Sequence, residues 1–131
     1  MTIGGINHIG INTEDFQASI AFYRDIMNME ILGEYDLGGD YVAYVKVDEK
    51  STIELFRNTE YPADQGSAGE RPGLKHLAFH VDDVDAWEKH LREKGYTITF
   101  GPADLPVIRQ RVMLFEAPDH VILELCTDMK S

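Results

Sequence analysis

One short sequence pattern occurs twice in this chain, and this internal repeat is the feature that most constrains the fold. Residues 5–12 and residues 73–80 both begin with the succession glycine, apolar, polar, histidine, apolar, small, apolar. The histidines of the two copies, His8 and His76, lie 68 residues apart. Because self-similarity at a fixed spacing marks a repeated structural unit, we expect two tandem modules of the same architecture.

The two copies are followed by the same succession of secondary-structure patterns. Apolar residues recur at helical spacing over about 14–28 in the first half and about 84–94 in the second half. Three strand-like stretches separated by Gly, Pro and Asp follow each helix. They cover about 30–37, 41–47 and 52–57 in the first half, and about 97–101, 110–116 and 120–127 in the second half. Each half is therefore predicted to be a strand, a helix and three strands.

The chain of 131 residues has the length of one ordinary domain. We expect a single domain spanning residues 1–131, with a first module over about 1–60 and a second over about 73–131. Residues 58–72, which are rich in Gly, Pro, Ala and charged residues, are predicted to link the two modules.

Composition excludes several classes of function. The 23 acidic residues exceed the 12 basic ones, and the net charge of −11 repels phosphate backbones, so we expect no nucleic-acid partner. No apolar run approaches the roughly 20 residues that span a bilayer, and the first residues do not have the pattern of a secretion signal. The single cysteine, Cys126, has no intramolecular partner, which fits a reducing compartment. We therefore expect a cytoplasmic protein without a membrane partner.

Strand alternation indicates the direction in which the repeated histidines point. Successive side chains of a strand lie on opposite faces of the sheet. The bulky residues Ile9 and Ile11 suit the face covered by the helix, so His8 is expected on the other face. The same alternation in the second copy turns His76 away from its helix.

Two carboxylates repeat in the same manner as the histidines. Glu54 and Glu124 lie 70 residues apart, each between two large aliphatic residues in the last predicted strand of its module. Taken alone, such a glutamate is more often a solvent-facing strand residue, and such a histidine is more often a hydrogen-bonded core or surface residue. Two imidazoles and two carboxylates in register across a repeat instead indicate a site for Zn, Fe, Mn, Co or Ni, which accept nitrogen and oxygen ligands.

Other side chains fit this metal site less well. His80 shares a face with His76 but lies about 13 Å farther along the strand, too far to bind the same ion. His120 is excluded by the same spacing from Glu124. Cys126 shares a face with Glu124, so it could line the cup, although a buried inert thiol is the commoner case.

With this repeat and these four residues, the chain resembles the vicinal oxygen chelate superfamily over its whole length. This superfamily includes glyoxalase I, the extradiol dioxygenases and the bleomycin resistance proteins, and the chain is most similar to its small bacterial glyoxalase I-like members. The motifs that carry the resemblance are Asn7-His8-Ile9-Gly10, Ile53-Glu54-Leu55, Leu74-Lys75-His76-Leu77-Ala78-Phe79, and Pro118-Asp119 followed by Leu123-Glu124-Leu125.

The resemblance implies a fold, a metal site and an assembly. The fold is α+β, with two tandem βαββ modules that form a curled mixed sheet, the cup around a divalent metal ion. The implied metal ligands are His8, Glu54, His76 and Glu124. Family members often pair modules between two chains, so a homodimer with ligands shared between subunits is expected.

Around this ligand set, one position matches the pattern of bacterial glyoxalases I, and one position and one turn depart from it. Asn12 stands where bacterial glyoxalases I commonly have an arginine that helps to hold glutathione. Asn58 matches another glutathione-contacting position. Residues 117–120 read Ala-Pro-Asp-His in place of the usual Asp-Pro-Asp-Gly turn. The ligand set is complete while the glutathione-binding set is half kept, so a substrate other than a glutathione adduct is open.

The resemblance implies a metal-dependent lyase or isomerase of glyoxalase type that stabilises an enediolate-like intermediate of a small substrate. By position Glu124 would be the mobile base that removes a proton, with Glu54 as its catalytic partner on the opposite face. Removal of a proton beside the metal needs no redox change.

Alternatives within the superfamily differ in their ligands and in their need for a metal. Epimerases acting on acyl-CoA thioesters typically have glutamine in place of Glu54. Extradiol dioxygenases use two histidines and one carboxylate. Fosfomycin-resistance transferases have basic residues beyond the last strand, which residues 128–131 do not match. A non-catalytic binder of the bleomycin-resistance type is the alternative from a different class, and it has no need of a complete ligand set.

Overall fold

The computed structural model describes residues 1–57 and 72–130. The chain divides into two compact units, Met1–Ala63 and Asp64–Ser131, and each unit contains one copy of the repeat. Asn58 and nearly all of the predicted linker lie outside the described residues. None of the helices in the described ranges is long and apolar enough to cross a membrane.

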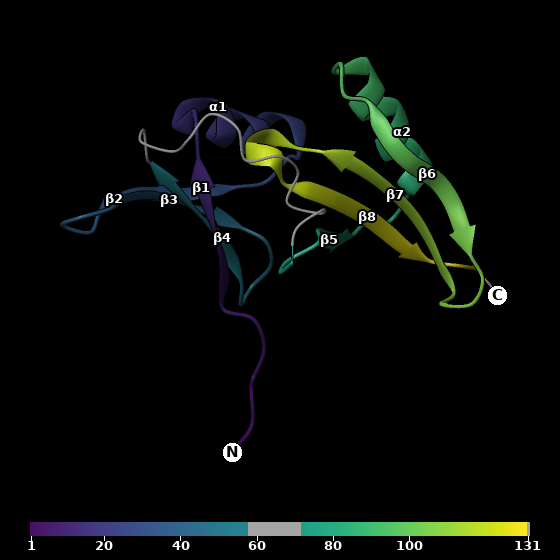
Figure 1. Ribbon diagram of the computed structural model, residues 1–131, viewed down its shortest axis with the longest axis horizontal. Helices are drawn as coiled ribbons and strands as arrows, with labels where there is room; N and C mark the ends of the chain where they lie inside the picture. The colour runs from purple at the N-terminus through teal and green to yellow at the C-terminus, as the bar shows by residue number, and fades with distance from the viewer. Residues whose placement is uncertain (58–71, 131) are drawn as a thin grey trace. The chain divides into compact units, whose positions relative to one another are not determined.

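The first unit contains a four-stranded mixed sheet with one helical segment (Figure 1). The strand order is β1-β4-β3-β2; β1 runs parallel to β4, and the other neighbours are antiparallel. The α-helix continues directly into a short π-helical segment. The elements are β1 (His8–Thr13), α1 (Phe16–Ala21), η1 (Phe22–Ile26), β2 (Ile31–Asp36), β3 (Tyr41–Lys46) and β4 (Thr52–Arg57).

The second unit repeats this topology. Its strand order is β5-β8-β7-β6, with β5 parallel to β8 and the other neighbours antiparallel. The elements are β5 (Leu77–His80), α2 (Val84–Glu93), β6 (Ile98–Leu105), β7 (Gln110–Glu116), η3 (Pro118–His120) and β8 (Ile122–Asp128). The prediction of an α+β fold built from two tandem modules, each a strand, a helix and three strands, is confirmed.

The helices begin at equivalent aspartates in the two units. The side chain of Asp15 accepts a hydrogen bond of 3.0 Å from the backbone N–H of Ala18, and Asp83 accepts one of 3.0 Å from Ala86. Both aspartates have extended backbone angles, as an N-cap residue requires. The first helix therefore begins at Phe16 rather than at residue 14, because Asp15 caps it.

The predicted apolar faces of the helices lie in the core. Phe16, Ile20, Tyr23 and Met27 are buried, as are Val84 and Leu91 in α2. Beneath them lie buried residues of the central strands, among them Ala43, Val45, Ile53 and Leu55 in the first unit and Met113, Phe115, Leu123 and Leu125 in the second. Helical periodicity and strand alternation thus meet on one face of each sheet.

Two element boundaries in the second unit were predicted wrongly. β6 continues to Leu105, although Pro102 was expected to end the strand near Gly101. An edge strand tolerates proline because one of its sides needs no ladder hydrogen bonds, and the register of β6 shifts at this point. His120 was placed in the last strand, but it lies in a short turn after Pro118 with φ 60°, and β8 begins at Ile122.

Candidate metal centre

In the first unit, the parallel pair of β1 and β4 brings a histidine to a glutamate. Gly10 pairs with Glu54 across the two strands, and His8 lies two residues before Gly10 on the same face. The Nε2 atom of His8 is 3.2 Å from Oε2 of Glu54. The two ligands predicted for the first module are therefore in direct contact.

The second unit repeats this arrangement between β5 and β8. Ala78 pairs with Glu124, and His76 lies two residues before Ala78, just ahead of the first residue of β5. The Nε2 atom of His76 is 3.1 Å from Oε2 of Glu124. The repeated sequence motif therefore forms the same His–Glu contact in both units.

The two carboxylates differ in their exposure to solvent. The side chain of Glu54 is 7% exposed and that of its partner His8 is 46% exposed, whereas Glu124 and His76 are 17% and 31% exposed. A carboxylate withdrawn from water needs positive charge or donors around it. The ion-pair partner found for Glu54 among residues 1–57 and 72–130 is His8, which carries charge only when protonated. A buried carboxylate oxygen beside an imidazole nitrogen is a donor pair that fits a divalent cation.

The orientation of His8 is supported by its neighbour in the chain. The Nδ1 atom of His8 lies 2.8 Å from Oδ1 of Asn7. When Nδ1 carries the proton and donates to Asn7, Nε2 has a free lone pair directed toward Glu54. A second hydrogen bond of this kind is how metal-binding histidines are commonly held in one tautomer.

Each glutamate has a further hydrogen-bonding neighbour. Tyr44 pairs with Glu54 across β3 and β4, and its hydroxyl is hydrogen-bonded to the carboxylate. Burial first, then the charge of Glu54 and this hydrogen bond, raise the pKa of Tyr44, so the phenol keeps its proton and donates. In the second unit, the Sγ atom of Cys126 lies 3.5 Å from Oε1 of Glu124. Burial and the nearby charge of Glu124 raise the pKa of Cys126 to about 11, so this thiol is a poor nucleophile at neutral pH.

Tyr44 is a neighbour of the site that sequence reasoning did not assign. Its alternation along residues 41–47 placed it either toward or away from the helix, and the choice depended on the register between β3 and β4. The short connection at residues 48–50 was the available signal. The length of a hairpin connection limits the register of the two strands that it joins, and this register places Tyr44 opposite Glu54.

The remaining histidines have other surroundings. His80 is exposed at the end of β5. The Nδ1 atom of His120 lies 3.3 Å from Oε1 of Glu116, and the ring of His90 contacts Trp87 edge to face at 5.4 Å. Within each unit, the described residues form His–Glu pairs but no group of three or more His, Cys, Asp or Glu side chains that could hold a metal ion. Joint binding of one ion by both pairs stays a prediction.

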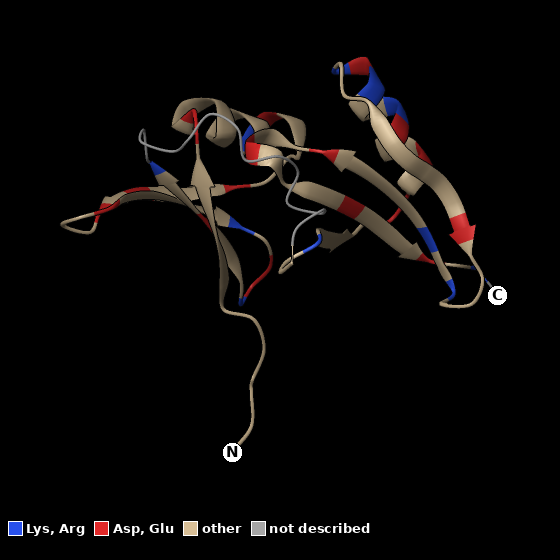
Figure 2. Cartoon of the chain, in the orientation of Figure 1, with Lys and Arg blue, Asp and Glu red and all other residues tan. Residues whose placement is uncertain are grey.

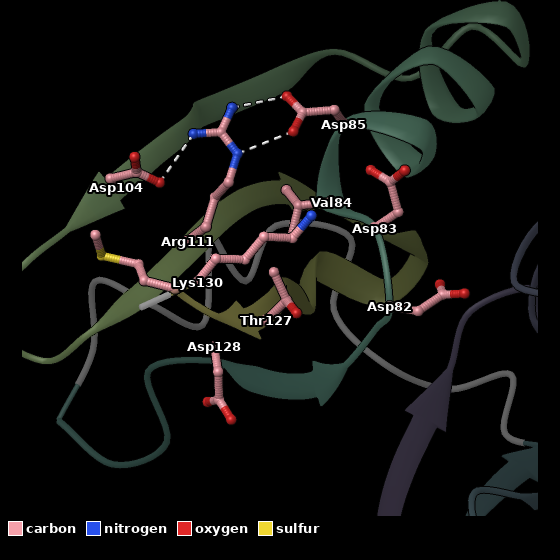
Figure 3. A pocket seen from close by; sticks show the side chains of 10 residues that line it. Asp82, Asp83, Val84, Asp85, Asp104, Arg111, Thr127, Asp128 and Lys130 are labelled. Carbon is pink, nitrogen blue, oxygen red and sulfur yellow. Dashed lines mark hydrogen bonds and ion pairs between the residues drawn. The ribbon is translucent and has the colours of Figure 1, made fainter.

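A separate hollow of about 600 Å³ lies in the second unit, beside the start of α2 (Figure 3). None of the four predicted ligands lines it. Arg111 spans its wall and donates to both carboxylate oxygens of Asp85, at 2.7 and 2.9 Å, and to Asp104 at 3.0 Å. Hydrogen bonds to these two carboxylates raise the pKa of Arg111, which stays protonated and is balanced by their negative charge. The arginine, in β7, thereby connects α2 and β6.

Acidic and basic residues occur in both units of the chain. Figure 2 shows Asp and Glu spread over both units, with Lys and Arg interspersed among them.

Comparison with known proteins identifies the class to which this fold and these residue pairs belong. The family model of the Glyoxalase/Bleomycin resistance protein/Dioxygenase superfamily matches residues 5–125. The chain therefore belongs to this superfamily, which confirms the resemblance seen in the repeated motifs.

Individual relatives cover nearly the whole chain. A probable lactoylglutathione lyase of Synechocystis sp. is 30% identical over 125 residues, which cover 90% of this chain and 91% of the relative. The metallothiol transferase FosB of Staphylococcus epidermidis is 29% identical over 130 residues, covering 97% and 84%. Among solved structures, a glyoxalase family protein from Enterococcus faecalis matches with a TM-score of 0.80 and 28% identity, covering 97% of this chain and 100% of that one.

Proposed function

We propose that this protein is a divalent-metal-dependent lyase or isomerase of glyoxalase type that acts on a small substrate with two adjacent oxygen atoms. The observation that carries the proposal is the pair of equivalent His–Glu contacts, His8 with Glu54 and His76 with Glu124. A superfamily relative named as a probable lactoylglutathione lyase, similar over nine-tenths of this chain, supports the same reaction class.

The four side chains provide the donors that such a site needs. Two imidazoles and two carboxylates suit Zn, Ni, Fe, Mn or Co, and a bound ion would act as a Lewis acid toward the anion formed when a proton is removed. The name of the relative FosB, a metallothiol transferase, is consistent with metal binding in this superfamily.

The two carboxylates divide the work of proton transfer. Glu124 is the base that takes the substrate proton, because its side chain is the more exposed of the two and its nearby thiol is a weak donor. Glu54 is buried and serves as the partner carboxylate on the opposite face of the substrate. Removal and return of the proton by these groups require no oxidant or reductant.

The substrate need not be a glutathione adduct. Asn12, where an arginine would help to hold glutathione, is exposed and belongs to the same strand as His8. An uncharged amide cannot pair with a carboxylate as an arginine does. We therefore include both hemithioacetals and acyl-CoA thioesters among the candidate substrates.

Metal analysis of the purified protein tests the proposal most directly. We expect about one divalent ion per site and a higher melting temperature when Zn²⁺, Ni²⁺, Mn²⁺ or Fe²⁺ is added, because an ion that binds only the folded state stabilises it. The metal-loaded protein is then assayed against hemithioacetals and acyl-CoA thioesters. Absence of bound metal together with absence of metal-dependent stabilisation would reject the enzyme in favour of a non-catalytic binder.

A further inference from the structure

The two glutamates face different neighbours across the sheet, although their modules share one topology. In the first unit a row of paired residues runs across four strands and consists of Gly10, Glu54, Tyr44 and Gly33. In the second unit the equivalent row consists of Ala78, Glu124, Leu114 and Phe100. Directly opposite its glutamate, the first unit therefore has a phenol where the second has an aliphatic side chain.

The phenol of Tyr44 is held in place by its own neighbours. The ring of Tyr35 packs edge to face against the ring of Tyr44, with the centroids 5.7 Å apart. Gly33, which pairs with Tyr44, makes room for this packing: a Cβ atom at Gly33 would lie 2.7 Å from the hydroxyl of Tyr35. The half-buried Tyr44 thus has little rotational freedom on the Glu54 face of the sheet.

Held in this way, Tyr44 can restrain the glutamate that it contacts. Tyr44 pairs directly with Glu54 across β3 and β4, on the face where Oε2 of Glu54 lies 3.2 Å from Nε2 of His8, so its hydroxyl can donate to the carboxylate. A carboxylate that accepts a hydrogen bond from a fixed phenol on the neighbouring strand must break that bond to rotate. Glu124 has Leu114 opposite it, which offers no hydrogen bond, and its hydrogen-bonding neighbour is the weakly donating thiol of Cys126 at 3.5 Å, so it is less restrained.

We propose that Tyr44 is a positioning residue that holds Glu54 as the fixed carboxylate ligand and thereby leaves Glu124 as the mobile one. This inference rests on the proposed metal-dependent function. It goes beyond that function because it names the residue that makes two ligands of the same chemical type behave differently.

The test compares Tyr44→Phe with a matched control on the same strand. Tyr41→Phe also removes a tyrosine hydroxyl that donates to a glutamate, Glu34 at 3.2 Å, but Tyr41 lies on the helix side and its ring contacts Phe16. Binding of Co²⁺ is measured by titration against a chromophoric chelator, and the visible absorption spectrum of bound Co²⁺ reports the ligand geometry.

The expected result is a loss confined to one variant. Tyr44→Phe should weaken Co²⁺ binding by about 10-fold, as is typical when a partner of a metal ligand is removed, and should change the Co²⁺ spectrum. Tyr41→Phe should bind within twofold of the wild type. In a Glu54→Gln background, Tyr44→Phe should add less than twofold, because Tyr44 acts through Glu54.

The outcomes separate this inference from the proposed function. If the wild type binds no Co²⁺, Zn²⁺ or Ni²⁺, the proposed function fails and Tyr44 has no ligand to position. If the wild type binds Co²⁺ and Tyr44→Phe binds it equally well with an unchanged spectrum, only the role of Tyr44 is overturned. An equal loss in the Glu54→Gln background also overturns it.

A reciprocal variant keeps the inference testable should Tyr44→Phe fold poorly. Leu114→Tyr places a phenol opposite Glu124, as Tyr44 is placed opposite Glu54. We expect Co²⁺ binding to strengthen several-fold, because both carboxylates would then be restrained. Unchanged affinity in this variant would contradict the role assigned to the phenol.

Discussion

The Nε2 atom of His76 lies 3.1 Å from Oε2 of Glu124, and the same contact recurs between His8 and Glu54 at 3.2 Å. In each unit this contact crosses the parallel pair formed by the first and last strands. The two pairs are thus equivalent in position, but Glu54 is less exposed than Glu124 and has a tyrosine rather than a leucine opposite it.

Removal of one imidazole should abolish tight metal binding. We expect His76→Ala to weaken Zn²⁺ or Ni²⁺ binding by more than about 100-fold, which exceeds the usual effect of losing an outer partner of a ligand. His80→Ala is the matched control, since His80 is exposed at the far end of β5. Isothermal titration calorimetry measures both. Equal binding by wild type and His76→Ala would remove His76 from the ligand set.

Loss of the mobile base should affect turnover more than substrate binding. Glu124→Gln should lower kcat by about 10²-fold to 10⁴-fold, the usual contribution of a general base, with a smaller change in KM. The control, Glu93→Gln, alters an exposed glutamate in α2 of the same unit. Steady-state kinetics with any substrate found in the screen checks this. Full turnover by Glu124→Gln would show that another group takes the proton.

A mixture of two inactive variants tests whether ligands are shared between subunits of a dimer. His8→Ala and His76→Ala are mixed, partly unfolded and refolded together. If each site combines His8 of one chain with His76 of the other, one of the two sites in a mixed dimer keeps all its ligands, and metal binding returns. Each variant refolded alone serves as the control. No recovery in a verified mixed dimer would place all the ligands of a site in one chain.

The thiol of Cys126 should react slowly at neutral pH. Its pKa of about 11, against 9.0 for an unperturbed thiol, reduces the thiolate fraction at pH 8 by about 100-fold. Alkylation of the metal-free protein by iodoacetamide should therefore be slow at pH 8 and rise as the pH approaches 11. Glu124→Gln removes a neighbouring negative charge, so it should lower this pKa and speed alkylation. A rate at pH 8 equal to that of a free cysteine would contradict the assignment.

The helix caps should contribute measurably to stability. Asp83→Ala removes the acceptor for the N–H of Ala86 and should lower the free energy of unfolding by about 1 kcal/mol. Asp83→Asn retains an oxygen acceptor and should cost only a few tenths of that amount. Urea denaturation followed by circular dichroism measures both. An equal loss in the two variants would point to the charge of Asp83 rather than to its hydrogen bond.

Much of the fold could be predicted from the sequence because local patterns and the core agree. The apolar stripe that includes Phe16, Ile20 and Tyr23 lies buried, and β4 and β7 have the predicted bounds. The boundaries of β6 and β8 were predicted wrongly because the local sequence pattern did not reveal the position of the strand in the sheet or the backbone angles of the turn. An edge position let β6 continue through Pro102, and a turn with positive φ at Asp119 removed His120 from the last strand.

For the site, the repeat and the alternation of side chains determined that His8 and Glu54, and likewise His76 and Glu124, face away from the helices. The repeat and the alternation are properties of short segments, so they can be recognised in a single sequence. Only the tertiary structure decided that Tyr44 lies opposite Glu54 while Leu114 lies opposite Glu124. Those neighbours depend on the register between strands, which is set by packing of the whole sheet rather than by any one strand.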